Sequence, residues 1–459
     1  MKTLQSVTSC LSDYDPHALP VALARTIIND LATPVAAVEK VALRAALGRV
    51  LAHDVLAPFN VPGHENSAMD GYAFAGAELA GKETVTLKVA GQAYAGIPHD
   101  APVAAGTCIR IMTGALLPAQ CDTVIAQEYV EADDGTGGGA DSGPDSDDKG
   151  GRENAALIRF GAAVVKPGSN VRHAGEDLAL GCVALPAGRL VTPADLGLLA
   201  SLSYAEVAVR RRLRVAFFST GDELRSVGEP LPPGCVYDSN RYTMYGMLQR
   251  LGVDIIDLGV VRDDRAALEA ALRTAAECAD AVITSGGVSV GDADYTRELM
   301  ARLGEVVFWK VAMRPGRPFA FGRISASGVG GSGVEADPQA GPGALFFGLP
   351  GNPVAVMVSF YVFVRDALLA MSGASPSPAP LLRASMVTAL RKRPGRSEFV
   401  RAHAQCDALG RWQVNATGAQ GSGMLSSMSR ANCLIVMDHD QGDVAAGEAV
   451  SIMLFSGLI

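Results

Sequence analysis

The sequence lacks closely spaced cysteines and histidines. Its 8 cysteines are spread along 459 residues, with no two within four residues of each other, and its 7 histidines are equally scattered. This spacing excludes a zinc ribbon or a redox-active cysteine pair. A chain of this length can bury its cores without disulfide bonds, so we expect reduced cysteines and a cytoplasmic protein.

The chain also lacks an excess of positive charge. It has 39 Lys and Arg residues against 48 Asp and Glu residues, a formal net charge of −9 at pH 7. Non-specific binding to nucleic acids or anionic membranes needs a basic surface, so we expect neither as a partner. Small anions remain candidates, because they need only a local cluster of positive charge.

No stretch has the pattern of a signal peptide or a membrane span. The first 16 residues contain Asp13 and Asp15 but no apolar core, so no signal peptide is expected. Residues 338–364 carry no charge, but the sequence Leu-Pro-Gly-Asn-Pro interrupts them at 349–353. A prolyl break would leave backbone groups unsatisfied in lipid, so we expect a buried strand, a loop and a buried helix there.

Two segments contain little that could be buried. Residues 131–153 and 325–342 are rich in glycine and small polar residues and show no apolar periodicity. Such segments cannot offset their ordering entropy, so both are expected to be solvated loops. The first holds eight acids and two bases, so most of the net negative charge lies in it and the rest of the chain is near neutral.

Residues 213–371 alternate between strand and helix patterns. Apolar runs of strand length are followed by longer segments with helix-capping residues and helical apolar spacing. This βαβαβ order predicts a parallel sheet with right-handed crossovers. The expected strands are residues 215–218, 253–261, 281–284 and 345–349, and the expected helices are residues 242–251, 265–278, 295–303 and 354–371.

The flanking regions have different patterns. Residues 17–31 and 34–51 look helical, whereas residues 55–124 consist of short strands and turns. Residues 380–459 alternate apolar and polar residues in short runs, which predicts a separate C-terminal β domain.

Four polar or Gly/Pro-rich segments follow predicted strands or precede predicted helices: residues 219–223, 238–240, 285–291 and 349–353. In open parallel sheets ligands bind beyond the carboxyl ends of the strands, so we expect these segments to meet at one rim. Three carboxylates there, Asp222, Glu223 and Asp238, are suited to hold a metal or to hydrogen-bond a heterocycle. Helix capping is an equally good account of Asp238.

The glycine-rich segment 285–291 joins a strand to a helix. It has neither the Walker A pattern nor the dinucleotide-binding pattern, and it predicts either a different phosphate-binding loop or a plain tight turn. Asp292 and Asp294 follow it, and carboxylates beside a phosphate need a bridging cation, which suggests Mg²⁺. Helix capping is the alternative, which we prefer for Asp292 but not for Asp294.

Positive charge is concentrated in residues 309–318 and 391–396, and both clusters contain Arg-Pro-Gly-Arg. The guanidinium fork suits tetrahedral oxyanions, and the Pro-Gly turn restrains both side chains. The alternative is a solvated basic surface.

Taken together, these segments resemble the MoeA-type molybdopterin molybdenumtransferases, the family that includes the gephyrin E domain. The matching strings occur in family order and the resemblance spans nearly the whole chain. They are NSAMDGYA at 66–73, MTGA at 112–115, GED at 175–177, STGDEL at 219–224, SGGVSVGDADY at 285–295, PGRPFAFG at 315–322, LPGNPV at 349–354 and QGS at 420–422.

The resemblance implies a fold and an activity. The fold would be α/β plus β: an elongated chain with a central parallel-sheet domain, an inserted β-rich domain and a C-terminal β-barrel-like domain. The expected domains are residues 1–62 with 163–196, 63–162, 197–375 and 376–459. The activity would be molybdenum insertion into adenylated molybdopterin, with molybdate as the second substrate and Mg²⁺-dependent release of AMP. The partners would be a second copy in a homodimer and, in addition, the adenylyltransferase and molybdoenzyme chaperones.

The resemblance also implies roles for residues, carried over by motif. Asp294, Asp238, Asp70 and Glu223 would be catalytic, with Asp294 and Asp238 also holding the metal. Arg314, Arg317, Arg396 and Ser422 would bind molybdate. Asp70 and Thr113 would come from the partner subunit. The expected substrate-binding residues are Ser67, Thr113, Asp222, Ser285, Gly286, Gly287, Ser289, Gly291, Pro350, Gly351, Asn352 and Pro353.

One departure from the family pattern affects the chemistry. The family commonly has Lys-Pro-Gly-Lys where this chain has Arg314-Pro315-Gly316-Arg317, and a guanidinium fork differs from a point charge. Preference between molybdate and tungstate therefore stays open. Two other functions also stay open: a non-catalytic pterin-binding scaffold and a molybdopterin adenylyltransferase.

Overall fold

A computed structural model describes residues 19–133, 157–287, 294–325, 343–376 and 378–458. Most of the two predicted loops lies outside these ranges. The exceptions are Ser325 and residues 131–133. Residues 131–133 form strand β8 (Glu131–Asp133) instead of the expected loop, because they pair with strand β9 (Leu157–Gly161). The chain forms two compact units, residues 1–53, 187–196 and 205–459, and residues 54–186 and 197–204.

The first unit contains a central six-stranded sheet in the order β16-β13-β17-β21-β20-β18. The first four strands are parallel, as the sequence predicts, but β20 and β18 are antiparallel to their neighbours. The expectation of a purely parallel sheet is therefore wrong at this edge, where a hairpin follows the last crossover. The strands are β13 (Arg214–Thr220), β16 (Asp254–Val261), β17 (Ala281–Ser285), β18 (Gly304–Lys310), β20 (Pro318–Ile324) and β21 (Ala344–Leu349).

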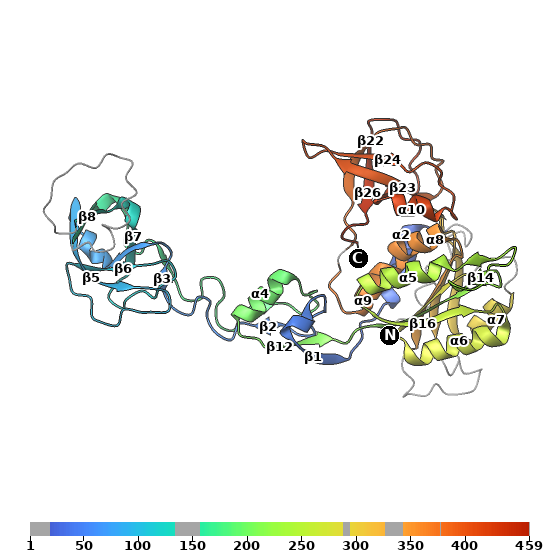
Figure 1. Ribbon diagram of the computed structural model, residues 1–459, viewed down its shortest axis with the longest axis horizontal. Helices are drawn as coiled ribbons and strands as arrows, with labels where there is room; N and C mark the ends of the chain where they lie inside the picture. Colours follow the sequence, from blue (N-terminus) through green and yellow to red (C-terminus); the bar gives the residue numbers. More distant parts are fainter. Residues whose placement is uncertain (1–18, 134–156, 288–293, 326–342, 377, 459) are drawn as a thin grey trace. The chain divides into compact units, whose positions relative to one another are not determined.

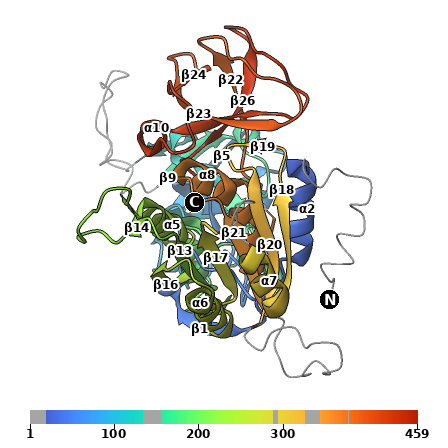
Figure 2. The same cartoon turned by 90° about the vertical axis from the view of Figure 1, so that its right-hand side faces the viewer.

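Helices cover both faces of this sheet (Figures 1 and 2). Along β13, Val215 and Phe217 join the core on one face, whereas Ala216 and Phe218 join the core on the other. This alternation sandwiches the strand between two helical layers. On the first face lie α2 (Val21–Leu31), α5 (Ser239–Arg250), α8 (Pro353–Ser359) and α9 (Arg365–Met371), and on the second lie α6 (Arg265–Cys278) and α7 (Asp294–Leu303).

Local sequence explains where these helices begin. Asp264 caps α6 by accepting hydrogen bonds from the backbone N–H groups of Ala266 and Ala267. In α8, Pro353 occupies the first turn, where its missing N–H costs nothing. A π-helical turn (Phe360–Val364) links α8 to α9, and 78% of the most apolar window in residues 353–371 is buried inside the protein. The uncharged run therefore packs as a core helix, as expected.

The predicted helix at residues 34–51 is wrong. The structure has strand β1 (Val38–Ala42) there, paired antiparallel with β12 (Glu206–Arg210), followed by a 3-10 turn (Leu43–Ala46). Val38 and Val41 are β-branched and favour the strand, and the left-handed Gly48 ends the turn.

The C-terminal part of the first unit is a closed five-stranded β-barrel (red in Figure 1), as the family resemblance implies. A short strand, β19 (Met313–Arg314), leaves the α/β part and pairs in parallel with the beginning of β23, which joins the two parts. The barrel comprises β22 (Leu382–Met386), β23 (Ser397–Cys406), β24 (Trp412–Ala416), β25 (Cys433–Met437) and β26 (Ala449–Leu454), with helix α10 (Leu425–Arg430) beside it.

The second unit is β-rich. Its main sheet has the order β7-β4-β6-β5-β9-β8, with two smaller strand pairs, β3–β10 and β2–β11. Helix α4 (Pro193–Ser201) follows them along the chain, and its residues are divided between the two units. The remaining strands are β2 (Val55–Leu56), β3 (Asn66–Ser67), β4 (Gly71–Phe74), β5 (Thr84–Ala93), β6 (Thr107–Ile111), β7 (Thr123–Ala126), β10 (Val171–Arg172) and β11 (Val183–Leu185).

Candidate functional site

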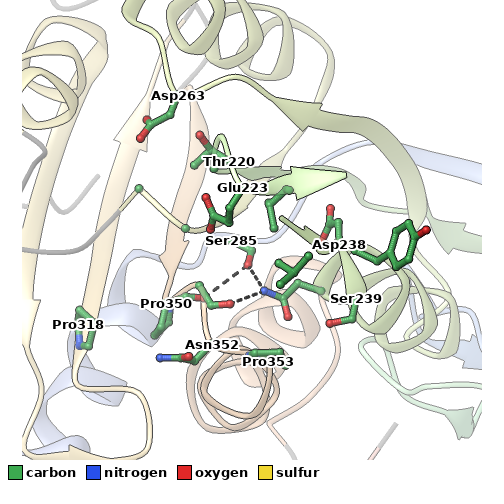
Figure 3. A pocket seen from close by; sticks show the side chains of 18 residues that line it. Thr220, Glu223, Asp238, Ser239, Asp263, Ser285, Pro318, Pro350, Asn352 and Pro353 are labelled. Atoms are coloured by element: carbon green, nitrogen blue, oxygen red, sulfur yellow. Dashed lines mark hydrogen bonds between the residues drawn. The ribbon is translucent and has the colours of Figure 1, made fainter. Parts of the chain in front are cut away.

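A cavity of about 490 Å³, the first hollow, opens at the carboxyl ends of the parallel strands (Figure 3). The four segments that the sequence predicts at this rim all contribute to it, together with the short pair β14 (Leu224–Arg225) and β15 (Val236–Tyr237). The residues that line it are Thr220, Gly221, Glu223, Leu224, Val236, Tyr237, Asp238, Ser239, Asn240, Asp263, Ser285, Gly286, Gly287, Pro318, Pro350, Gly351, Asn352 and Pro353.

Gly286 lets the loop after β17 pass close to the end of β13. It has φ +95°, and a Cβ atom there would lie 2.4 Å from the carbonyl oxygen of Thr220. Any other residue would force the two segments apart, so glycine is required at this position. Ser289, Gly291 and Asp292, which the sequence places in and just after the same loop, lie outside the described residues.

Three carboxylate residues line the cavity: Glu223, Asp238 and Asp263. Asp238 is buried and caps α5 with Oδ1, which accepts a hydrogen bond from the Arg241 N–H, so the capping account of this residue is correct. Its Oδ2 has no hydrogen-bond partner among the described residues. Asp222 does not line the cavity; its Oδ1 accepts a bond from the Asp263 N–H at 3.3 Å. Asp294 is the first residue of α7, and the structure does not describe its side chain.

These acids fit Mg²⁺, which prefers oxygen donors and in proteins usually takes one or two carboxylates together with substrate phosphates. No group of three metal-ligating side chains occurs within the described ranges, so a cage made of protein atoms alone is absent there. The unpartnered Oδ2 of Asp238 is one oxygen that a cation could use.

A second hollow of about 510 Å³ adjoins the first and shares Pro318, Pro350 and Asn352 with it. It lies where the α/β part meets the barrel, and the Val354 N–H donates to the carbonyl oxygen of Ser422 across this junction. It is lined by all four residues predicted to bind molybdate: Arg314, Arg317, Arg396 and Ser422.

The arginines of this second hollow differ in their partners. Arg396 Nε donates to Glu398 Oε1 at 2.9 Å, and Glu398 is 7% exposed. Arg314 makes no ion pair with any residue that the structure describes and is exposed. The predicted cluster is therefore brought together, but with unequal freedom to bind a ligand.

Arg401 supports the same hollow from behind, and the sequence reasoning missed it. It is 1% exposed, and its guanidinium donates to the carbonyl oxygens of Ala419, Gln420 and Gly421 at 2.9–3.2 Å. Burial lowers the pKa of Arg401, and the nearby charge of Arg314 lowers it further. A single arginine within strand β23 gives no local signal of this role. The sequence reasoning also missed Asp263, which follows β16 and lines the first hollow.

Three predicted residues belong to the second unit and form a cluster of their own. Asp70 Oδ1 accepts hydrogen bonds from the backbone N–H and the hydroxyl of Thr113, both at 2.7 Å. These bonds hold the pKa of Asp70 below its usual value. Ser67 is buried, and its hydroxyl donates to the carbonyl oxygen of Met69.

Comparison with known proteins agrees with this architecture. Family models described as MoeA N-terminal region (domain I and II), probable molybdopterin binding domain and MoeA C-terminal region (domain IV) match residues 19–203, 216–370 and 383–455. The molybdopterin molybdenumtransferase of Haemophilus influenzae is 40% identical over 92% of this chain and 95% of its own. The chain belongs to the MoeA family of molybdopterin molybdenumtransferases.

Further relatives support the family assignment. Molybdopterin molybdenumtransferase 2 of Mycobacterium tuberculosis is 36% identical over 90% of this chain and 94% of its own. The crystal structure of the molybdopterin biosynthesis moeA protein from Pyrococcus horikoshii OT3 superposes with a TM-score of 0.75 at 26% identity, covering 95% of this chain and 100% of that one. The resemblance found in the sequence and the predicted fold class of this MoeA-family chain are therefore confirmed.

Proposed function

We propose that this protein inserts molybdenum into adenylated molybdopterin in the cytoplasm and releases AMP in a Mg²⁺-dependent reaction. The observation that carries the proposal is the pair of adjoining hollows, one lined by carboxylates and glycine loops, the other by arginines. A substrate with a pyrophosphate and a dithiolene pterin needs a cation-assisted phosphate site next to an oxyanion site. The shared residues Pro318, Pro350 and Asn352 support the proposal, because they make the two hollows adjoin.

In the first hollow, the backbone around Gly286 and Gly287 and the turn from Pro350 to Pro353 would hold the pterin nucleotide. Glycine lets the chain approach phosphate oxygens closely. Asp294 and Asp238 are the proposed Mg²⁺ ligands, with Glu223 as a further acid at the same cavity. Bound Mg²⁺ would offset the charge that builds up on the phosphates when the pterin phosphate–AMP bond breaks.

In the second hollow, Arg314, Arg317, Arg396 and Ser422 would bind molybdate as substrate. Arginine forks match a tetrahedral dianion. Arg401 would keep the Gln420–Ser422 loop against the bound oxyanion through its bonds to the loop carbonyls. In the proposed homodimer, Asp70 and Thr113 of one subunit would complete the site of the other.

The test is an AMP-release assay with purified protein, adenylated molybdopterin, Mg²⁺ and molybdate. We expect AMP release that requires Mg²⁺, and we expect the Asp294→Ala variant to bind the pterin nucleotide but release AMP at least 100-fold more slowly. Pterin binding without AMP release by the unmodified protein would favour a scaffold. Consumption of ATP with free molybdopterin would favour an adenylyltransferase.

A further inference from the structure

One buried amide ties together three segments around the first hollow. Asn240 is the second residue of α5 and is 7% exposed. Its Nδ2 donates two hydrogen bonds of 2.7 Å, one to Ser285 Oγ at the end of β17 and one to the carbonyl oxygen of Gly351 after β21 (Figure 3). Ser285 Oγ in turn lies 3.5 Å from the carbonyl oxygen of Pro350 and donates to it. The start of one helix and two separate loops thus meet at a single side chain.

The chemistry of this contact is specific to an amide. An asparagine NH₂ group carries two hydrogens, and both are used here to bind acceptors on different loops. Oδ1 has no hydrogen-bond partner among the described residues, so the two donated bonds fix the side chain. A carboxylate at this position would point an anionic oxygen at the Gly351 carbonyl, and an alanine would leave a buried acceptor unpaired.

The two loops that Asn240 joins carry different parts of the proposed substrate site. Ser285 directly precedes Gly286, whose backbone crowds the end of β13, and Gly351 lies within the turn from Pro350 to Pro353. Both Pro350 and Asn352 also line the second hollow. The spacing between these loops therefore decides whether one ligand can touch both.

We propose that Asn240 is a positioning residue that holds Gly286 and Gly287, directly after β17, and the Pro350–Pro353 turn at a fixed separation. It acts through Ser285 and Gly351, and its importance for turnover rests on the proposed function. The loss of Asn240 lowers the affinity for the nucleotide part of the substrate about tenfold, the effect of one buried hydrogen bond. The molybdate concentration that gives half-maximal AMP release changes less, because the two hydrogen bonds donated by Asn240 go to Ser285 and Gly351 and not to the arginines of the second hollow.

The test compares Asn240→Ala and Asn240→Asp with a matched control, Asn432→Ala. The Asn432 side chain also bonds two backbone groups, at 2.7 and 2.8 Å, but in the barrel, where both groups belong to the single residue Ala404. Hydrogen exchange at residues 286–287 and 351–352 reports loop positioning without any ligand, and titration with AMP and Mg²⁺ reports the site. We expect both loops to exchange faster in Asn240→Ala and to be unaffected in Asn432→Ala.

The pH profile separates positioning from a general loss of stability. At pH 8 the ionised Asn240→Asp variant should exchange faster than Asn240→Ala, because its carboxylate repels the Gly351 carbonyl. A protonated carboxyl can donate one of the two lost bonds, so loop exchange in Asn240→Asp should slow relative to Asn240→Ala as the pH falls from 8 towards the pKa of the introduced carboxyl, each measured against unmodified protein at the same pH. Unchanged loop exchange in Asn240→Ala, or exchange in Asn240→Asp at pH 8 that is no faster than in Asn240→Ala, would overturn the proposal. If the loops exchange faster in Asn240→Ala but the unmodified protein does not bind AMP, the result would instead count against the proposed function.

Discussion

The tetrapeptide Arg-Pro-Gly-Arg occurs twice in this chain, at 314–317 and at 393–396, and the two copies have different neighbours. Both glycines have the same left-handed backbone, with φ +101°. All four residues of the first copy line the second hollow, whereas the second copy contributes only Arg396. A Cβ atom at Gly316 would lie 2.7 Å from Ser359 Oγ, but one at Gly395 would meet nothing within 4 Å.

The difference shows how much of the motif's structure depends on its surroundings. Both copies place the glycine in the left-handed region, but the Arg314–Pro315 peptide bond is cis and the Arg393–Pro394 bond is not, so the two turns differ. The neighbours of each arginine determine whether its guanidinium is available to bind a ligand. Arg314 has no ion-pair partner in the described part of the chain, while Arg396 is bonded to the buried Glu398. The two copies therefore share the conformation of the glycine but differ in the turn around it and in the partners of their arginines.

The largest expected effect follows from this inequality. Arg314→Ala removes a cation whose hydrogen-bonding capacity is free for an oxyanion, so molybdate should bind about 10- to 100-fold more weakly. Arg396→Ala should weaken molybdate binding less, about fivefold, because part of that guanidinium is already committed to Glu398. Calorimetric titration of molybdate into the two variants measures the ratio, and equal losses would remove the distinction between the copies.

A second variant sharpens the same comparison. In Glu398→Gln the carboxylate that holds Arg396 loses its charge, so Arg396 should gain freedom and molybdate binding should become severalfold tighter. The Glu448→Gln variant, at a glutamate of the C-terminal domain that accepts a hydrogen bond from the Ala445 N–H, serves as the control for the same change of charge away from the hollow. Weaker molybdate binding in Glu398→Gln would mean that the pair orients Arg396 instead of restraining it.

The glycines provide the next largest effect. Gly395→Ala should cost about 1 kcal/mol of unfolding free energy, since only the left-handed backbone is penalised. Gly316→Ala should cost about 2–3 kcal/mol, because the new methyl group also collides with Ser359 Oγ. Ser359 is fully buried and its hydroxyl has no partner among the described residues, so Ser359→Ala should be nearly neutral and should rescue Gly316→Ala. Urea denaturation of the four variants tests this, and a rescue that fails would place the strain elsewhere.

Much of the fold could be predicted because local chemistry dictates it. The apolar runs of β13 and β17 and the capping residue Asp264 mark strands and a helix without reference to the rest of the chain. The rim of the first hollow follows from the general rule for parallel sheets. What the sequence reasoning missed depends on distant neighbours. The end of edge strand β18 overlaps the basic cluster at 309–318, and the strand is defined by its antiparallel pairing with β20. The role of Arg401 is recognised only when the loop at 419–421 is seen to bond to it.

The smallest expected effect concerns Lys392, which precedes the second Arg-Pro-Gly-Arg copy and anchors it. Its Nζ donates to the carbonyl oxygens of Gln441 and His439, at 2.6 and 3.2 Å, and burial lowers the pKa of Lys392. The charges of Glu398, Asp438 and Asp440 oppose that shift and the charge of Arg396 adds to it.

Because the lowered pKa belongs to the folded state, the unfolded chain holds more protons just below the usual lysine pKa. The stability that depends on Lys392 should therefore be fully present above the pKa of the unfolded state. It should be lost as the pH falls through the pKa of the folded state. The Lys392→Met variant lacks this titration, so the difference in unfolding free energy between the two proteins should shift in favour of the unmodified one between pH 8 and about 10.5. If the unfolding free energies of the two proteins stay parallel across this pH range, the hydrogen bonds to the carbonyl oxygens of Gln441 and His439 offset the cost of burying the charge. In that case the second copy would be anchored as firmly when Lys392 is charged as when it is neutral.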